Sequence, residues 1–270
     1  IAFAMEASEK GLLDEKISWG DGKLINDLIE KIAHRESGIG DFLASGIDEI
    51  KNRLDADFAM EIKGQELPMH DPRGKKGLAI SYATSPRGAT HLEGIHDDMM
   101  EGKEKLVPEL GLTKPVDRLS WEGKARLTKT FEDLYSFTDS AIICGFVSWS
   151  RSTGDAYPYP EIREILKSVT GMHIDKKEMV RIAERNYLLR RIDLARHGYR
   201  KYNDDLPARL KKPLLKGGSS GEGIDDKMLR KAIDSYYKLR GFDSYGPTDK
   251  KLTELGLEEL KGLIDREKIE

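Results

Sequence analysis

The spacing of apolar residues constrains this fold most. They recur every three or four positions along much of the sequence, whereas runs that alternate between apolar and polar residues are rare. Leu24, Leu28 and Ile32 follow such a stripe, and a second stripe runs from Val180 to Leu194. Spacing of three or four residues places side chains on one face of a helix, whereas a half-buried strand needs strict alternation. The sequence therefore predicts a mainly α-helical protein with little strand.

Capping residues mark where the predicted helices begin and end. Asp175 precedes the second stripe with Glu178 three residues later, which is a capping-box pattern, and Gly198 follows its end. Asp41 is the predicted cap of a helix that runs to about Arg53. Further helices are predicted over residues 1–11, 117–137 and 225–239, and the best strand candidate is the short run 57–64.

Residues 64–94 do not fit a helix, because three prolines and several glycines interrupt them. An irregular stretch of this length inside a compact domain is usually functional or disordered. Apolar residues such as Leu78, Ile80 and Tyr82 argue against disorder. We therefore expect a folded loop that serves a function. Its polar residues are Glu66, His70, Asp71, Arg73, Arg87 and His91.

The sequence holds a single cysteine, Cys144, which lies in an apolar segment five positions after Asp139. A lone cysteine is most often a buried free thiol, since cysteine behaves as a small hydrophobic residue. It excludes a disulfide within this chain, which is typical of proteins from a reducing cytoplasm. The nearby carboxylate leaves a functional role open.

Charge and hydropathy narrow the classes of partner. Lys and Arg total 45 against 48 Asp and Glu, a formal net charge of -3, so no overall positive field attracts nucleic acid. No apolar run approaches the ~20 residues that a membrane helix needs.

Glutamine and asparagine are scarce beside the abundant charged residues, a bias typical of thermophile proteins. Because the chain begins within a predicted helix at Ile1, we expect that an N-terminal portion was removed or forms a separate chain.

Two His–Asp groups and two arginines are also candidate binding residues. His70 with Asp71, and His96 with the two aspartates after it, have no recognised metal-ligand spacing, so no dedicated zinc site is predicted. Arg73 and Arg87 stand beside turn glycines, which suits either an anionic ligand or a salt bridge within the loop. No Walker sequence occurs, and no G-x-G-x-x-G run follows a predicted strand.

Six blocks of sequence, taken in order, resemble one family. They read SWGD, IEKIAHRESGIGDFLASG, ELPMHDPRGKKGLAISYATSPRGATH, TDSAIICGF, DDLPARL and SYYKLRGFD. Together they are similar to the C-terminal half of the aldehyde ferredoxin oxidoreductases, tungsten (or molybdenum) enzymes with a bis-pterin cofactor and a [4Fe-4S] cluster. The resemblance implies two packed α-helical domains. Residues 1–60 would be the end of the family's middle domain, and residues 61–270 its C-terminal domain with an irregular active-site loop.

The resemblance also implies roles for individual residues. In the segment DSAIIC, Asp139 corresponds to a pterin-binding aspartate and Cys144 to one of the four cysteines that hold the cluster. A carboxylate suits the N–H edge of a pterin, and a thiolate is the ligand that an iron–sulfur cluster requires. Ile143 replaces a leucine that contacts the cofactor by packing and backbone. The apolar run around Cys144 predicts that the thiol is buried where two domains meet.

The histidine of RGATH, His91, corresponds to the family's active-site histidine. It is the predicted catalytic residue, acting as proton donor or hydrogen-bond donor to the substrate oxygen. The sequence departs from the family at Glu93, where a pterin-contacting lysine is expected, and at Asn26, where a histidine would help to bind an interface iron. Neither contact is carried over to this chain.

The resemblance implies a cytoplasmic enzyme that interconverts aldehydes and carboxylates with ferredoxin as electron partner, and that is active only with its N-terminal half. An alternative is a non-catalytic helical binding or assembly domain with an incomplete cofactor site. Another is a family member that acts on an aromatic thioester. Neither nucleic acid nor a membrane is an expected partner, and whether the protein forms a homo-oligomer stays open.

Overall fold

The computed structural model describes residues 1–94, 96–102, 111–145 and 159–266. It divides the chain into two compact units, Ile1–Leu67 with Pro207–Arg209, and Pro68–Leu206 with Leu210–Glu270. Helices dominate both units, and the described part of the chain has only two short pairs of strands. The mainly α-helical fold is therefore confirmed. The match of residues 1–60 and 61–270 to two domains of the family stays a prediction.

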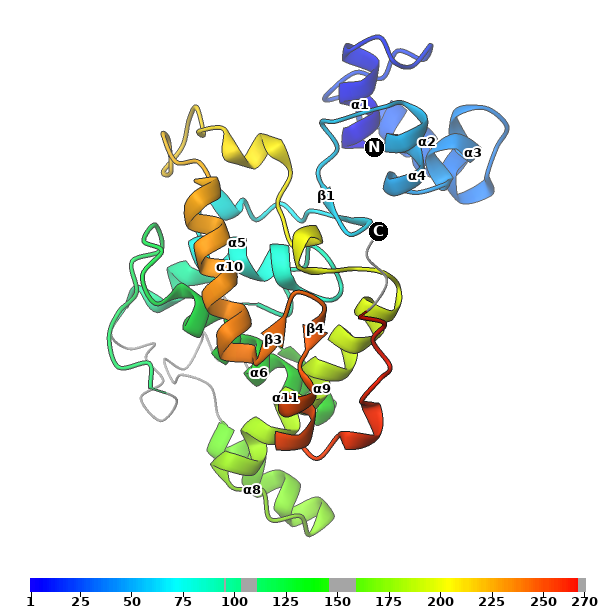
Figure 1. Cartoon of the computed structure of the whole chain (residues 1–270). Helices are drawn as coiled ribbons and strands as arrows, with labels where there is room; N and C mark the ends of the chain where they lie inside the picture. The colour runs from blue at the N-terminus through cyan, green and yellow to red at the C-terminus, as the bar shows by residue number, and fades with distance from the viewer. Residues whose placement is uncertain (95, 103–110, 146–158, 267–270) are drawn as a thin grey trace. The chain divides into compact units, whose positions relative to one another are not determined.

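The first unit contains four helices, which Figure 1 draws in blue. They are α1 (Ala2–Glu9), α2 (Gly22–His34), α3 (Ile39–Ala44) and α4 (Ile47–Arg53). Their apolar faces share one core that includes Met5, Leu28, Leu43 and Ile50. The side chain of Asp21 caps α2 by accepting from the Leu24 N–H. The stripe predicted from Leu24 to Ile32 is therefore a helix with one buried face.

Two predictions in the first unit were wrong in detail. A single helix capped by Asp41 was expected up to Arg53, but Gly46, with φ of 86°, separates α3 from α4. Asp41 lies inside α3, whose N-cap is Gly38. Of the strand candidate 57–64, only β1 (Glu61–Ile62) is extended, and it pairs antiparallel with β2 (Gln65–Glu66) across a two-residue turn.

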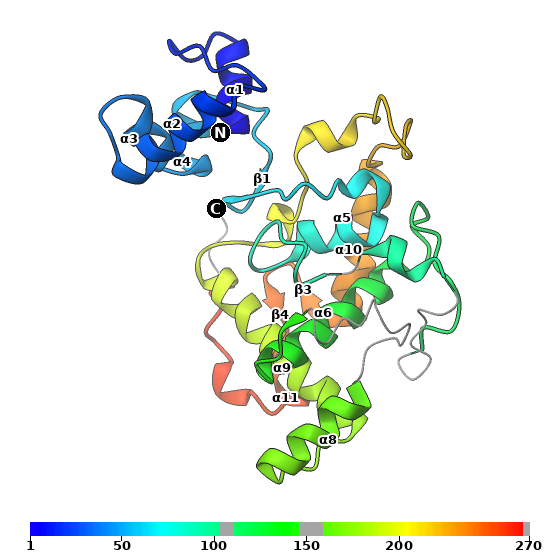
Figure 2. The same cartoon turned by 180° about the vertical axis from the view of Figure 1, so that it is seen from behind.

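In the second unit α6 (Lys124–Ser140) is the central helix. It packs against α5 (Lys76–Thr84), α9 (Lys176–Arg196) and α10 (Asp226–Arg240), and both views show it among them (Figures 1 and 2). The other described elements of this unit are α8 (Tyr159–Thr170), α11 (Asp249–Glu254), the antiparallel pair β3 (Phe242–Asp243) and β4 (Gly246–Pro247), and 3₁₀ turns at Pro72–Gly74, Asp97–Met100, Lys201–Asn203 and Glu258–Leu260. A further 3₁₀ turn, Ala208–Lys211, begins in the segment assigned to the first unit.

The predicted cap of α9 is confirmed, because the Asp175 side chain accepts from the Glu178 N–H. The start of α6 is later than predicted. Asp117 accepts from the N–H of Leu119, and Ser120 accepts from that of Glu122, so these side chains hold a turn in place of a first helical turn.

Helix α5 lies inside the stretch that was predicted to be irregular. All nine of its residues are buried, so it is surrounded by protein on every side and shows no apolar stripe that would indicate a helix. Its N-terminal N–H groups, those of Gly77 and Leu78, donate to the remote carboxylate of Asp97 at 2.9 and 3.0 Å. No helix in the described part of the chain is long and apolar enough to cross a membrane.

Candidate functional site

A cavity of about 550 Å³ in the second unit brings together three of the four predicted site residues. His91, Asp139 and Cys144 all line it. Ile143 does not line it, and packs instead beside the core cluster that contains Phe137. The structure thus gathers the predicted polar residues around one space and leaves the predicted packing residue in an apolar environment.

The loop that carries His91 is anchored by residues that follow His91 in the sequence. Asp97 is fully buried, caps α5 and pairs with the buried Lys124. Gly94 lies so close to α5 that a Cβ there would collide with Ser81, which explains why this position has no side chain. Helix α5 and the loop are therefore fixed against each other, and His91 lies on a braced segment.

Three imidazole rings meet at the cavity. The ring centroids of His70 and His91 are 4.6 Å apart, those of His70 and His96 are 4.7 Å apart, and those of His91 and His96 are 5.8 Å apart. Partial burial lowers the pKa of His91, and the neighbouring His70 and Lys75 lower it further. His91 is therefore a neutral imidazole at pH 7, able to accept a proton at one ring nitrogen and to donate from the other.

The histidine cluster is not arranged as a metal centre. The ring nitrogens of His96 lie 3.2 Å from Lys75 Nζ and 3.2 Å from the His91 carbonyl. Asp71 forms an ion pair with Arg73 at 2.6 Å, so the salt-bridge alternative holds for that arginine. Within the described ranges, no group of three or more His, Cys, Asp or Glu residues is placed to hold a metal ion.

Asp139 occupies the last turn of α6, at the rim of the cavity. No hydrogen bond or ion pair from the described residues reaches its carboxylate, although other carboxylates on the same helix are paired. Partial burial and the nearby Glu93 charge raise the pKa of Asp139, and Arg190 and Arg87 oppose this shift. A helix C-terminus is also an unfavourable place for a negative charge. The ionised carboxylate of Asp139 therefore lowers the stability of the folded chain.

Glu93 adds a second carboxylate to the cavity wall, at the position where the resemblance led us to expect lysine. Its Oε1 lies 2.8 Å from Arg190 of α9. Its Oε2 is buried and has no hydrogen-bond partner in the described part of the chain. A buried, unpaired carboxylate oxygen is costly, so this wall has an unused acceptor where a cationic contact was expected.

Cys144 is exposed, so its predicted burial is wrong for this chain by itself. Helix α6 ends in a Schellman-type turn, in which Ile142 adopts a left-handed conformation with φ of 57° and the Ile143 N–H bonds to the Thr138 carbonyl. A β-branched residue rarely adopts this conformation. The turn directs the chain out of the core, which leaves Ile142 93% exposed and Cys144 at the cavity.

Sequence reasoning missed several residues of the cavity. Tyr135 lines it one helical turn before Asp139, and this spacing of four residues could have indicated it. Lys75, which forms an ion pair at 2.8 Å with Asp98, had no local signal, because only the folded loop brings it to the cavity.

Known proteins are similar to this chain over almost its whole length. Residues 1–257 match the family model described as aldehyde ferredoxin oxidoreductase, domains 2 and 3. The chain belongs to the aldehyde ferredoxin oxidoreductase family. It is 32% identical over 272 residues to the tungsten-containing aldehyde ferredoxin oxidoreductase of Pyrococcus furiosus, and 31% identical over 273 residues to that of Thermococcus kodakarensis. Each alignment covers 96% of this chain and 42% of the relative.

Two more distant matches extend the comparison. The chain is 28% identical over 287 residues to a WOR-like subunit of an aliphatic sulfonate oxidoreductase from Pyrococcus furiosus, covering 98% of this chain and 40% of that one. A solved structure of the active-site complex BamBC of benzoyl coenzyme A reductase matches with a TM-score of 0.69 and 22% identity, over 96% of this chain and 43% of that one. At this identity the second match shows a shared fold. The chain spans less than half the length of all these relatives.

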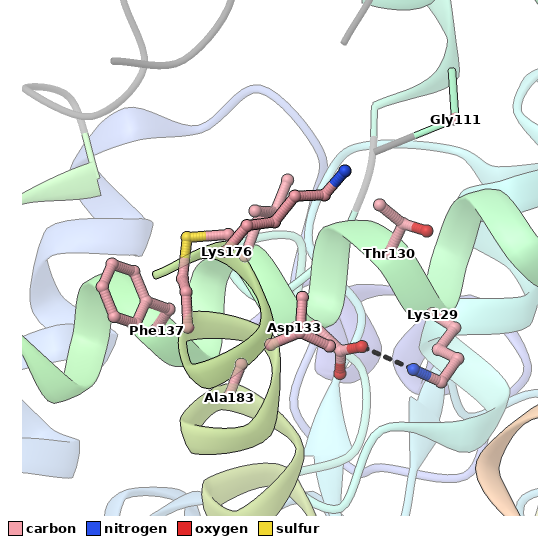
Figure 3. Close-up of a pocket in the computed structure, with 10 residues that line it drawn as sticks. Gly111, Lys129, Thr130, Asp133, Phe137, Lys176 and Ala183 are labelled. Carbon is pink, nitrogen blue, oxygen red and sulfur yellow. Dashed lines mark hydrogen bonds and ion pairs between the residues drawn. The ribbon is translucent and has the colours of Figure 1, made fainter. Parts of the chain in front are cut away.

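A second cavity, of about 300 Å³, lies between α6 and α9 and contains none of the residues predicted from the aldehyde ferredoxin oxidoreductase family. Figure 3 shows its lining, with Lys129 and Asp133 of α6 joined by an ion pair and with Phe137 and Ala183 nearby. The ion pair between Lys129 and Asp133 measures 2.7 Å.

Proposed function

We propose that this chain is the C-terminal portion of a tungsten- or molybdenum-dependent oxidoreductase that interconverts aldehydes and carboxylates with ferredoxin as electron partner. The observation that carries the proposal is the single cavity lined by His91, Asp139 and Cys144. Because the chain spans less than half of its relatives, the remaining residues of the site would come from the N-terminal portion. With one cysteine the chain can form no internal disulfide, which fits a cytoplasmic enzyme.

The residues present fit a bis-pterin cofactor and an iron–sulfur cluster. Asp139 has a carboxylate that is free of partners among the described residues, and Glu93 has an unused buried oxygen. Both can accept from the N–H edge of a pterin. Cys144 supplies one exposed thiol, and since a cluster needs four thiolates the other three belong to the missing portion. When bound, the metal and the cluster would supply the two-electron oxidation and the onward transfer of single electrons.

His91 would handle the proton that this reaction must move. Oxidation of an aldehyde with one water molecule yields a carboxylate, two electrons and three protons. The lowered pKa of His91 keeps its imidazole neutral at pH 7, so that a ring nitrogen can take up one of these protons as general base. In the reverse direction the protonated ring returns it. In the resting enzyme the ring N–H can donate a hydrogen bond to the substrate oxygen.

The rest of the cavity wall would orient the substrate and limit water. Met99 is buried and Tyr135 is half-buried at the cavity, so part of the lining is apolar. Their exclusion of water would strengthen every polar contact that His91 makes. Which aldehyde fits depends also on the segment that this chain lacks.

Elemental analysis of the assembled protein tests the proposal. The chain is produced together with the N-terminal portion of the same enzyme, and tungsten, molybdenum and iron are measured per assembled pair. We expect one tungsten or molybdenum atom and about four iron atoms. The alternative, a non-catalytic assembly domain, predicts a stable pair that contains neither metal, and that result would overturn the proposal.

A further inference from the structure

We propose that Lys75 and His96 form a positioning pair for His91: the Lys75 ammonium donates to Nδ1 of His96, which fixes the proton on Nε2, and this N–H holds the backbone carbonyl of His91. The inference deepens the proposed function, on which it rests for the catalytic use of His91. Neither Lys75 nor His96 would contact the reacting atoms. Both would act through the loop that carries His91.

The direction of the hydrogen bonds follows from the chemistry of the donors. Lys75 Nζ lies 3.2 Å from His96 Nδ1. An ammonium group has three donors and no acceptor, so Nδ1 must accept and cannot carry a proton. A neutral imidazole then carries its proton on Nε2. That atom lies 3.2 Å from the carbonyl oxygen of His91, which can only accept.

The surroundings keep both members of the pair in these states. Asp98 lies 2.8 Å from Lys75 Nζ, and this ion pair holds the Lys75 side chain in place. His96 is only 5% exposed. Burial, followed by the Lys75 and His70 charges, lowers the pKa of His96 to about 4. At neutral pH His96 is therefore uncharged, as the hydrogen-bond pattern requires.

The pair braces the loop at His91 itself, in addition to the anchors at Gly94 and Asp97. Asp97 fixes the following residues to the N-terminus of α5. His91 lies several residues earlier, and its ring contacts His70 and His96. A hydrogen bond to its own carbonyl restrains the backbone from which the ring projects. Loss of that restraint would let His91 shift, and a shift of about 1 Å at a catalytic group can cost about a hundredfold in rate.

NMR spectroscopy of the unloaded full chain, labelled with ¹⁵N at histidine, measures the tautomer directly. Spectra of His91→Gln and His96→Gln variants assign the two rings. We expect His96 to show the pattern of a ring protonated at Nε2, unchanged from pH 7.5 to 5.5. A ring protonated at Nδ1, or one that becomes charged near pH 6.5, would overturn the proposal.

Variants at Lys75 test whether the pair controls His91. Lys75→Met removes the donor, so His96 should populate both tautomers and the His91 ring signals should shift. Lys75→Arg keeps a cationic donor and should restore the Nε2 tautomer, whereas Lys216→Met, on an exposed loop, should change nothing. Unchanged His96 and His91 signals in Lys75→Met would overturn the pair.

Turnover separates this proposal from the function on which it rests. In the assembled enzyme, Lys75→Met should lower turnover per bound metal about 10- to 100-fold, and Lys75→Arg should recover most of it. If the tautomer result holds but His91→Ala keeps full turnover, the catalytic role of His91 is wrong and the positioning pair stands. A second outcome would overturn the positioning role. In it, His91→Ala is inactive and Lys75→Met changes the His91 signals, but Lys75→Met keeps full turnover. The pair would then not position His91 for catalysis.

Discussion

Two carboxylates on the same face of α6 have opposite surroundings, although they are only two helical turns apart. Glu132 is fully buried and accepts hydrogen bonds from Ser81, Tyr236 and Arg240. Asp139 lies at the cavity and receives no hydrogen bond or ion pair from the described residues. The first carboxylate holds three segments of the chain together, and the second has its accepting oxygens unused.

The difference indicates what each carboxylate is for. The Glu132 contacts join α5, α6 and α10, and a buried charge is tolerated only when it is paired in this way. Asp139 stands at the unfavourable end of the helix, with a pKa raised by burial and by Glu93. Such a residue reduces stability in the free chain, which is typical of a group kept for binding.

The largest effect is expected at the cavity itself, in His91→Ala. Loss of a general base lowers turnover by roughly 10²–10⁴-fold. Folding and metal content should be retained, because His91 is half-buried on a loop and belongs to no core cluster of the described residues. The measurement is activity per bound tungsten with a small aldehyde and an artificial electron acceptor. His197→Ala, at the exposed end of α9, is the control. Wild-type activity per tungsten in His91→Ala would rule out the catalytic role.

The paired region should respond through stability. Arg240→Ala leaves Glu132 and Asp133 buried without their shared guanidinium. Breaking a buried pair in this way costs about 3–5 kcal/mol. Urea unfolding followed by circular dichroism measures the change in the free energy of unfolding. The exposed Arg196→Ala is the control and should stay within about 0.5 kcal/mol of wild type. An equally small loss in Arg240→Ala would show that the network contributes little to the fold.

At the unpaired carboxylate the expected loss is in cofactor retention. Asp139→Asn keeps the shape of the side chain and removes a charge-assisted hydrogen bond worth about 1.5–3 kcal/mol. The assembled enzyme should lose its tungsten roughly 10- to 150-fold more readily on dialysis. Glu164→Gln, with an exposed carboxylate on α8, should retain the metal like wild type. Equal retention in both variants would make Asp139 a structural residue.

The smallest effect concerns the stability of the unloaded chain and its dependence on pH. The pKa of Asp139 is raised on folding, so the folded state binds this proton more tightly, and ionisation of Asp139 destabilises it as the pH rises. Asp139→Asn removes that penalty. It should be slightly more stable than wild type at pH 7, by less than about 0.5 kcal/mol, and this advantage should vanish as the pH falls below 3.8. A variant less stable than wild type at pH 7 would show that Asp139 supports the fold.

Much of this architecture could be predicted from local patterns. Asp175 caps α9 as expected, because a capping box is a short-range signal. Helix α5 was missed because all of its residues are buried, and a helix surrounded by protein has no polar face to reveal its period. The division at Gly46 was missed because the stripes of α3 and α4 appear continuous in the sequence.

The irregular loop by itself indicated His70, Arg87 and His91 as candidates, and all three line the cavity. The roles of His91, Asp139 and Cys144 came from the resemblance, and the structure brings these three to the same cavity. The contact between Lys75 and His96 joins residues 21 positions apart, and the neighbouring Asp97 ties this part of the loop to the N-terminus of α5. No periodicity in the sequence encodes such a contact. The exposure of Cys144 was missed because the apolar segment around it resembles a buried strand or helix, whereas Ile142 turns it outward.

The iron, sulfide and tungsten content of Cys144→Ala, assembled with the N-terminal portion, tests most directly whether this cavity is a cofactor site. Cys144 is an exposed thiol at the cavity in this chain, and a cluster that loses one of four thiolate ligands is damaged or lost. We expect iron and sulfide to fall well below the wild-type content while tungsten largely remains. Full iron and sulfide in the variant would contradict it, because Cys144 would then be a free thiol with no part in holding the cluster.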